Sequence, residues 1–247
     1  MRTLTKITLV AALLAGSTYT TFAKNSHHTA VSKPAQETED RHLSGFTAVA
    51  VAGSYDVFIT QGSTESVKVE APSDIIGRII TEVKDGVLKI YSKNDGNNGW
   101  NWSGNKKLII YVTAKTIKAV SLSGSGDVYF KDGIKGDDLE LKVVGSGDIA
   151  GKVNVKNLES SVSGSGDIKL SGSAENSTVK VVGSGDFTAG SLVTSYTIVK
   201  VAGSGDARVN ASKKIEASVV GSGDVHYTGS VKDISTSKAG SGDISRF

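Results

Sequence analysis

The chain has 247 residues, of which 29 are Gly and only 2 are Pro, and it contains no Cys. This length fits one large domain or two small ones. Glycine is enriched, at about 12% against the usual ~7%, but the scarcity of proline excludes collagen and a proline-rich linker. The absence of Cys excludes a disulfide scaffold, a thiolate metal site and a lipid-modified Cys. A net charge of +3 is too small and too dispersed to predict nucleic acid as a partner.

Residues 1–23 have the pattern of a secretory signal peptide. Arg2 and Lys6 precede an apolar run at 7–15, and small and polar residues follow up to Ala23. About nine apolar residues are too few for a membrane-spanning helix, which needs ~20. We therefore expect an exported protein, located in the periplasm, on the cell surface or outside the cell, with no membrane span after cleavage. Residues 24–43 are expected to form a flexible leader.

Residues 44–120 contain short strand-like stretches without an exact repeat. Apolar positions cluster at 46–51, 57–59 and 67–69, and residues 79–91 predict a hairpin with a two-residue turn at Asp85-Gly86. We expect this less regular β part to begin the repeat array that follows. It should also cover the open end of that array, since an exposed sheet edge promotes aggregation.

An unusual segment interrupts this region at residues 94–105. Its sequence, Asn-Asp-Gly-Asn-Asn-Gly-Trp-Asn-Trp-Ser-Gly-Asn, contains both tryptophans of the chain. Aromatic rings beside amide groups suit the recognition of a sugar or a protein, and loops often carry function. The candidate binding residues are Trp100, Trp102, Asn98 and Asn101. The alternative is an insertion whose rings only cover the end of the array.

The tetrapeptide Gly-Ser-Gly-Asp occurs seven times, at steps of 21, 19, 19, 20, 18 and 19 residues. An eighth, degenerate copy is Gly53-Ser54-Tyr55-Asp56. An apolar residue follows each Asp of the seven copies, and another stands two places before the first Gly in six of them. Lys238 takes that place in the last copy, where a cap is expected. The first glycines are Gly124, Gly145, Gly164, Gly183, Gly203, Gly221 and Gly240.

This spacing predicts an all-β fold, a parallel right-handed β-helix (solenoid) with rungs of about 19 residues. Stretches such as 139–143 alternate with the period of two that is typical of strands. A propeller blade needs ~40 residues, whereas a solenoid rung stacks on the next at about 4.8 Å. The left-handed hexapeptide helix is disfavoured because its turn has a strict length. We expect one domain over 44–247, with regular repeats at 121–247 and positive φ at both glycines of each turn.

The order of these features resembles a family of exported bacterial proteins described as putative auto-transporter adhesin, head GIN domain. The resemblance rests on the strand containing Phe46 that leads into 53–57, on the hairpin at 85–90, and on the serial Ser-Gly-Ser-Gly-Asp turns. The ending at 221–229 is also similar. The resemblance implies a β-helical fold and an envelope or surface location. It implies no catalytic residues.

The repeated aspartates are the first candidates for chemistry. If they stack at ~4.8 Å, each neighbouring pair repels by about 0.9 kcal/mol even at the dielectric constant of water. In one interpretation they bind calcium as a ladder. In the alternative, each carboxylate caps N–H groups of a turn, and an unchanged melting temperature in a chelator would favour this alternative. These residues are Asp127, Asp148, Asp167, Asp186, Asp206, Asp224 and Asp243.

Catalysis finds little support in the sequence. Seven equivalent turn serines do not form one activated nucleophile, and no Gly-x-Ser-x-Gly motif occurs. A polysaccharide-active enzyme would concentrate two carboxylates in one groove, whereas these acids are spread evenly. We expect a non-enzymatic envelope or surface binding module without a cofactor or metal, whose ligand is a glycan or a protein. The alternatives are a polysaccharide-active β-helix enzyme and a structural or self-assembling envelope protein.

Overall fold

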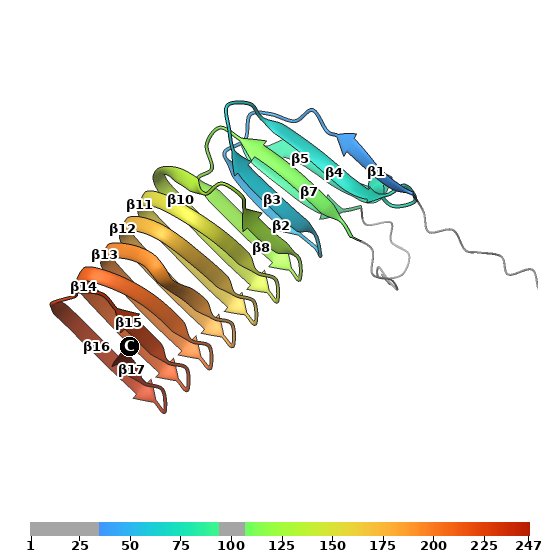
Figure 1. The fold of residues 1–247 in the computed structure, drawn as a ribbon. Helices are drawn as coiled ribbons and strands as arrows, with labels where there is room; N and C mark the ends of the chain where they lie inside the picture. Colours follow the sequence, from blue (N-terminus) through green and yellow to red (C-terminus); the bar gives the residue numbers. More distant parts are fainter. Residues whose placement is uncertain (1–34, 94–106) are drawn as a thin grey trace, which may run out of the picture. The chain divides into compact units, whose positions relative to one another are not determined.

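The computed structural model describes residues 35–93 and 107–247, which belong to one compact unit. This part is nearly all β, and a solenoid of about seven turns with rungs of roughly 19 residues dominates it (Figure 1). The predicted all-β solenoid is thus confirmed. All strands join one hydrogen-bonded ladder of 17 strands.

Two groups of strands follow one another along the chain. The first group is β1 (Gln36–Asp40), β2 (Ala48–Ala52), β3 (Asp56–Gln61), β4 (Ser66–Pro72), β5 (Ile79–Lys84), β6 (Val87–Ser92) and β7 (Ile109–Ala114), with a single 3-10 turn η1 (Ile76–Arg78). The second group is β8 (Ala119–Gly124), β9 (Asp127–Phe130), β10 (Ile134–Gly145), β11 (Ile149–Gly164), β12 (Ile168–Gly183), β13 (Phe187–Gly203), β14 (Ala207–Gly221), β15 (Val225–Thr228), β16 (Asp233–Gly240) and β17 (Ile244–Arg246).

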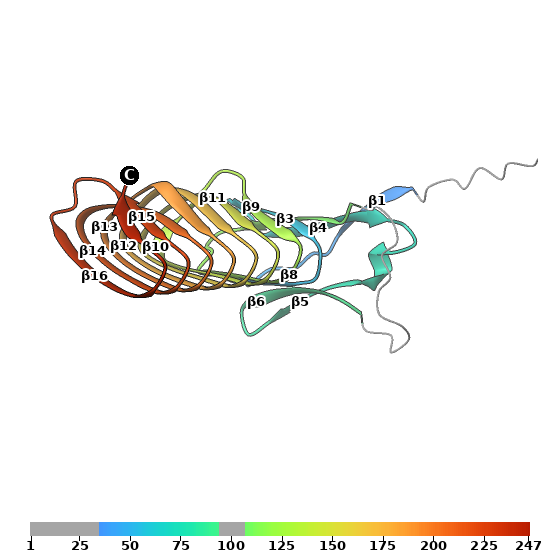
Figure 2. The same ribbon diagram turned by 90° about the horizontal axis from the view of Figure 1, so that it is seen from below.

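Each rung runs toward its Gly-Ser-Gly-Asp turn in one sheet layer and away from it in the other. We call these the pre-turn layer and the post-turn layer, and Figure 2 shows β8 in the first and β9 in the second. The long strands belong to both layers: the end of β10 pairs with β8, whereas the start of β11 pairs with β9, both in parallel. Neighbouring rungs are therefore in register at every turn.

The core lies between the two layers. Period-two alternation directs every second side chain inward, and the two apolar columns that flank the turns are buried as predicted. The column before the turns comprises Leu122, Val143, Val162, Val181, Val201 and Val219, all at most 2% exposed. The column after the turns comprises Val128, Ile149, Ile168, Phe187, Ala207 and Val225, all at most 1% exposed.

The first part of the chain begins the array, as expected. Strand β2 pairs in parallel with β8 and β3 with β9, so the degenerate motif at 53–56 forms the first turn. On the other side β6 continues the pre-turn layer and β7 the post-turn layer. The predicted hairpin is strands β5 and β6, and both residues of its turn have positive φ, 53° at Asp85 and 73° at Gly86.

One strand lies within the stretch where a flexible leader is expected, residues 24–43. In the described part of that stretch, β1 pairs antiparallel with β4, from Gln36 opposite Pro72 to Asp40 opposite Lys68. All five of its side chains are exposed. Hydrophobic periodicity cannot reveal such a strand, because it buries no side chain and pairs with β4 through its backbone.

The last rung ends the core with polar side chains. Strand β16 pairs with β14 alone among the described strands, and all eight of its residues are exposed. Lys238 stands opposite Val219 in the inward column, and its ammonium lies 3.2 Å from Oδ1 of Asp243. A charge at an inward position of an edge strand hinders further strand addition, so Lys238 has the position of the predicted cap.

Candidate functional sites: the aspartate column and the aromatic row

The two glycines of each turn have different physical roles. The first glycines have φ between 119° and 132°, a conformation that L side chains rarely adopt. The second glycines do not share it. At Gly147 an added Cβ would lie 2.0 Å from the carbonyl oxygen of Gly126 in the preceding rung. The expectation of positive φ at both positions is thus wrong for the second, where close stacking of the turns excludes any side chain.

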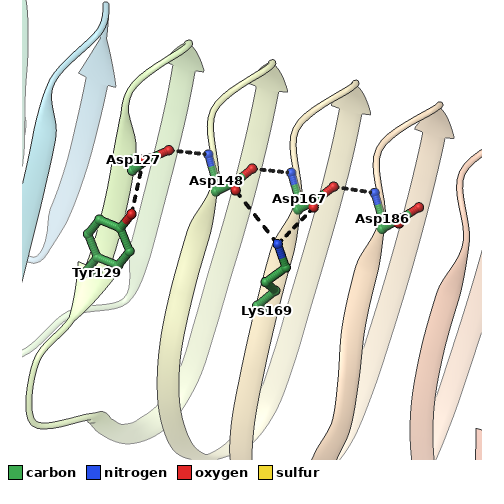
Figure 3. A network of polar contacts seen from close by, with 6 residues as sticks. All are labelled: Asp127, Tyr129, Asp148, Asp167, Lys169 and Asp186. Carbon is green, nitrogen blue, oxygen red and sulfur yellow. Dashed lines mark hydrogen bonds and ion pairs between the residues drawn. The ribbon is translucent and has the colours of Figure 1, made fainter. Parts of the chain in front are cut away.

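The stacked turns leave one N–H group for the aspartate to satisfy. The carbonyl of Gly124 accepts from the N–H of Ser146 at 2.9 Å and of Gly147 at 3.0 Å. The next N–H, that of Asp148, donates instead to Oδ1 of Asp127 at 3.1 Å. Figure 3 shows how this bond recurs from turn to turn. The later members of the series are Asp167 to Asp148, Asp186 to Asp167, Asp206 to Asp186, Asp224 to Asp206 and Asp243 to Asp224, at 2.7–2.9 Å.

We call these seven residues, Asp127 to Asp243, the aspartate column. Each carboxylate except the last binds the backbone of the next rung, which explains why an acceptor recurs at this place in every turn. Hydrogen bonds to an ionised acceptor are among the stronger ones in proteins. Within the described ranges, no three His, Cys, Asp or Glu side chains gather as a possible metal site.

The degenerate turn departs from this scheme. Tyr55 replaces the second glycine, is 1% exposed, and its hydroxyl hydrogen-bonds with Ser92. The N–H of Asp127 then donates to the carbonyl of Tyr55 at 2.9 Å rather than to a carboxylate. Burial and the neighbouring charge of Asp127 raise the pKa of Asp56, while Lys107 opposes this shift.

The second carboxylate oxygens face side chains on the post-turn layer. The hydroxyl of Tyr129 donates to Oδ2 of Asp127 at 3.1 Å, and Lys169 lies 3.1 Å from Oδ2 of Asp167 and 4.0 Å from Oδ2 of Asp148 (Figure 3). The pKa of Lys169 is raised, first by its hydrogen bond to Asp167 and also by the charge of Asp148. Burial, and then the charge of Asp127, raise the pKa of Tyr129.

Three aromatic rings form a second feature beside the column, which we call the aromatic row: Tyr111, Phe58 and Tyr129. They occupy registered positions on β7, β3 and β9. The rings stack, with centroids 5.7 Å apart for Tyr111 and Phe58 and 5.4 Å apart for Phe58 and Tyr129. The ammonium of Lys131 lies 4.1 Å from the centroid of Phe58. Sequence reasoning missed this row, because the three residues come together only through strand register.

Tyr111, the tyrosine at the β7 end of the aromatic row, is held in place through its hydroxyl. Tyr111 is 40% exposed, and its hydroxyl donates to Oε2 of Glu70 at 3.3 Å. Burial and the charge of Glu70 raise its pKa. Both tyrosines of the aromatic row thus have hydroxyls held by carboxylates, which restricts the orientations of their rings.

The predicted binding residues Trp100, Trp102, Asn98 and Asn101 lie outside the described residues. Of the described residues on either side, Lys93 contacts the 3-10 turn η1 and Leu108 contacts the first turn. Lys93 donates its N–H to the carbonyl of Arg78 at 2.9 Å, and the carbonyl of Leu108 accepts from the N–H of Asp56 at 2.9 Å. Residues 93–108 join β6, in the pre-turn layer, to β7, in the post-turn layer. In the later rungs a Gly-Ser-Gly-Asp turn makes the connection between these two layers.

A further row of polar side chains, Asp138, Asn157 and Asn176, lies just before the pre-turn segments of β10, β11 and β12. The side-chain amide of Asn157 donates to Asp138 at 2.7 Å, and that of Asn176 donates to Asn157 at 2.9 Å. A shallow depression lies here, lined among others by Lys118, Glu140 and Glu159. The row repeats the principle of the aspartate column, in which one side chain connects successive rungs.

Comparison with known proteins identifies a family and several solved structures that are similar to this chain. A family model described as "Putative auto-transporter adhesin, head GIN domain" matches residues 45–231. The chain belongs to this family. The head GIN domain resemblance expected from the turns and the hairpin is therefore confirmed. A search of curated proteins found no match.

Several solved structures are similar to this head GIN domain protein. A putative adhesin from Bacteroides fragilis is 27% identical, with a TM-score of 0.81, over 86% of this chain and 97% of that one. A putative lipid binding protein from Parabacteroides distasonis is 26% identical, with a TM-score of 0.68, over 86% and 96%. A putative adhesin from Parabacteroides merdae, at 22% identity and a TM-score of 0.67 over 86% and 96%, shares the fold. Across the described ranges, no helix has the length and apolar character needed to cross a membrane.

Proposed function

We propose that this head GIN domain protein is a non-enzymatic, exported binding module of the bacterial cell envelope or surface. The observation that carries the proposal is the register of the outward side chains. On the pre-turn layer, one outward row combines small hydroxyls and ammonium groups at the rung spacing of about 4.8 Å. It comprises Ser121, Lys142, Ser161, Lys180, Lys200, Ser218 and Ser237.

Such a surface suits an extended partner that makes many weak contacts. Several contacts from one rigid scaffold add up, because the second and later contacts form at a high effective concentration. The family description, which names an adhesin, supports this function. Export is part of the proposal and is supported by the signal-peptide pattern of residues 1–23.

The aspartates support a structural role over a catalytic one. A glycosidase uses a pair of carboxylates that flank one bond. Here Oδ1 of each carboxylate from Asp127 to Asp224 accepts an N–H of the next rung. The aspartate column therefore supports the scaffold of a binding module rather than a catalytic site.

The tryptophan segment belongs to the proposal as a binding element. The next described strand along the chain, β7, begins at Ile109, two residues before Tyr111, the first ring of the aromatic row. If Trp100 and Trp102 contribute, a double substitution to Ala should weaken binding while the chain stays folded. Unchanged binding by that folded variant would remove the segment from the site.

The test measures whether the chain binds saturably to cells or envelopes and whether it releases saccharide from polysaccharides. The labelled full chain is titrated onto whole cells and envelope fractions of Bacteroides and Parabacteroides, with vesicles of phospholipid as a separate arm. In parallel it is incubated with a panel of polysaccharides. We expect saturable binding to cells or envelopes and no released saccharide. Release of saccharide would contradict the proposal in favour of an enzyme, and binding confined to vesicles would favour the lipid-binding function named for the Parabacteroides distasonis protein.

A further inference from the structure

The aromatic row is the centre of a longer line of outward side chains on the post-turn layer. Strand register places Lys68 beside Tyr111 at one end, and Ala150 followed by Lys169 beside Tyr129 at the other. The rungs bring these residues to intervals of about 4.8 Å. Three rings with an ammonium group beyond each end thus lie in one straight line across six strands.

The ring of Tyr129 has a neighbour on one side only. Phe58 stacks on it with centroids 5.4 Å apart, but the next residue in the line is Ala150, which is partly exposed. A methyl group is too short to cover an aromatic ring. Lys169 is one strand further, and its ammonium is held by Asp167 at 3.1 Å. The line of outward side chains is therefore shortest at Ala150, between the longer Tyr129 and Lys169, and we call this position the notch.

Polar groups of both charges surround the rings. Asp148 borders the notch, and within the described part of the chain its Oδ2 has only the ammonium of Lys169, 4.0 Å away, as an ion-pair partner. The ammonium of Lys131 lies above Phe58. Within this small area a ligand meets an aromatic surface, the carboxylate of Asp148 and the ammonium groups of Lys131 and Lys169.

We propose that the aromatic row, with the notch over Ala150, binds carbohydrate, and that the ligand is a neutral oligosaccharide. The proposal names the ligand class of the binding module proposed above and rests on that function. A sugar ring presents C–H groups of slight positive character, which suit the negative face of an aromatic ring. Its hydroxyls both donate and accept, so they match Asp148 and Lys169 together.

The local charges favour a neutral ligand over an ion. The chain's own ammonium groups already occupy the places that a cation would take, Lys131 above Phe58 and Lys169 between two carboxylates. An anion would meet the carboxylates of Asp127 and Asp148. A rigid platform of aromatic rings with a few fixed polar groups is the arrangement that small-molecule sites use.

Cross-strand ring pairs also stabilise sheets on their own, so the test must separate binding from packing. Ala150→Gln fills the notch and leaves every ring in place. Its matched control is Thr188→Gln, which adds the same side chain to the same line of outward residues one strand beyond Lys169. Tyr129→Ala removes the ring, and Tyr129→Phe removes only the hydroxyl that binds Asp127.

The experiment is calorimetric titration of the full chain with linear oligosaccharides of glucose, mannose, galactose and N-acetylglucosamine. Folding of each variant is checked by its urea midpoint. We expect binding of at least one oligosaccharide, a Kd about tenfold weaker in Ala150→Gln and Tyr129→Ala, and a change below about twofold in Thr188→Gln and threefold in Tyr129→Phe.

Two results would overturn the proposal. One is that no oligosaccharide binds. The other is that Ala150→Gln binds as tightly as the unmodified chain. If cells or envelopes are still bound saturably in either case, the carbohydrate platform is wrong and the binding module stands. If cells and envelopes are not bound, the proposed function itself fails.

Discussion

At the scale of single residues, each turn aspartate uses one carboxylate oxygen to bind the backbone of the following rung. Asp186 shows the consequence most clearly, because its Oδ1 accepts from the N–H of Asp206 at 2.8 Å. Removing this acceptor leaves a partly buried N–H group without a partner, which costs more than the loss of an average hydrogen bond.

We therefore expect Asp186→Ala to lower the free energy of unfolding by about 1–3 kcal/mol in urea titrations. Asp186→Asn keeps an acceptor oxygen and reduces the repulsion between neighbouring carboxylates, so its cost should be below about 1 kcal/mol. Equal losses in both variants would show that the charge, and not the acceptor, is needed at this position.

A buried serine gives a prediction of the opposite sign. Ser160 is 1% exposed and stands between Leu141 and Val179 in an inward column. Its hydroxyl has no hydrogen-bond partner among residues 35–93 and 107–247. Ser160→Val should raise the free energy of unfolding by about 1 kcal/mol, since it removes an unsatisfied hydroxyl and adds apolar contact. A lower urea midpoint would indicate that the column has no room for the larger side chain.

Some of these features at the scale of single residues could be predicted from residue types alone. The two buried columns beside the turns follow from alternation, and Lys238 is recognisable as the one exception in its column. The need for the second glycine was misassigned, because the contact that demands it, between Gly147 and the carbonyl of Gly126, lies between rungs. The aromatic row was missed for the same reason: Phe58 and Tyr111 become neighbours only once strand register is known.

At the scale of the elements, the turns stack so closely that a methyl group cannot enter. Gly147→Ala should therefore destabilise the protein by about 2 kcal/mol or more, because an added Cβ would lie 2.0 Å from a carbonyl oxygen. The matched control is Gly136→Ala, where an added Cβ meets nothing within 4 Å. Equal urea midpoints for the two variants would contradict close stacking of the turns.

The last rung has its own protection against association. Strand β16 exposes its free edge, and Lys238 places a charge where the inward column would otherwise continue. Lys238→Val should increase the apparent mass in light scattering as the protein concentration rises, since an apolar edge strand invites pairing with another chain. Ser237→Val, an outward substitution on the same strand, is the control. Identical masses for both variants would show that Lys238 does not protect the edge.

Elements were predictable where their side chains alternate or repeat. The hairpin β5–β6 and the rung spacing follow from such patterns. Strand β1 does not, because all five of its side chains are exposed and its pairing with β4 leaves no hydrophobic pattern in the sequence.

At the scale of the whole described part, stability is distributed along the array. A solenoid gains its stability from contacts between neighbouring rungs, and the aspartate column adds one side-chain hydrogen bond to each of the last six of these steps. The scaffold then presents its outward rows in register, which is the property that the proposed binding function uses. Repeat spacing predicted the scaffold, whereas the ligand-binding rows depend on which strands register places side by side.

The most direct test of this account is an NMR measurement of the aspartate amide protons in the unmodified chain and in Asp186→Ala. We predict that the N–H protons of Asp148, Asp167, Asp186, Asp206, Asp224 and Asp243 resonate at unusually low field and exchange slowly. In Asp186→Ala the N–H proton of Asp206 should shift to higher field and exchange faster, because its acceptor is removed. Fast exchange of these amides in the unmodified chain, or an Asp206 N–H that Asp186→Ala leaves unchanged, would contradict the claim that the aspartate column holds the rungs together.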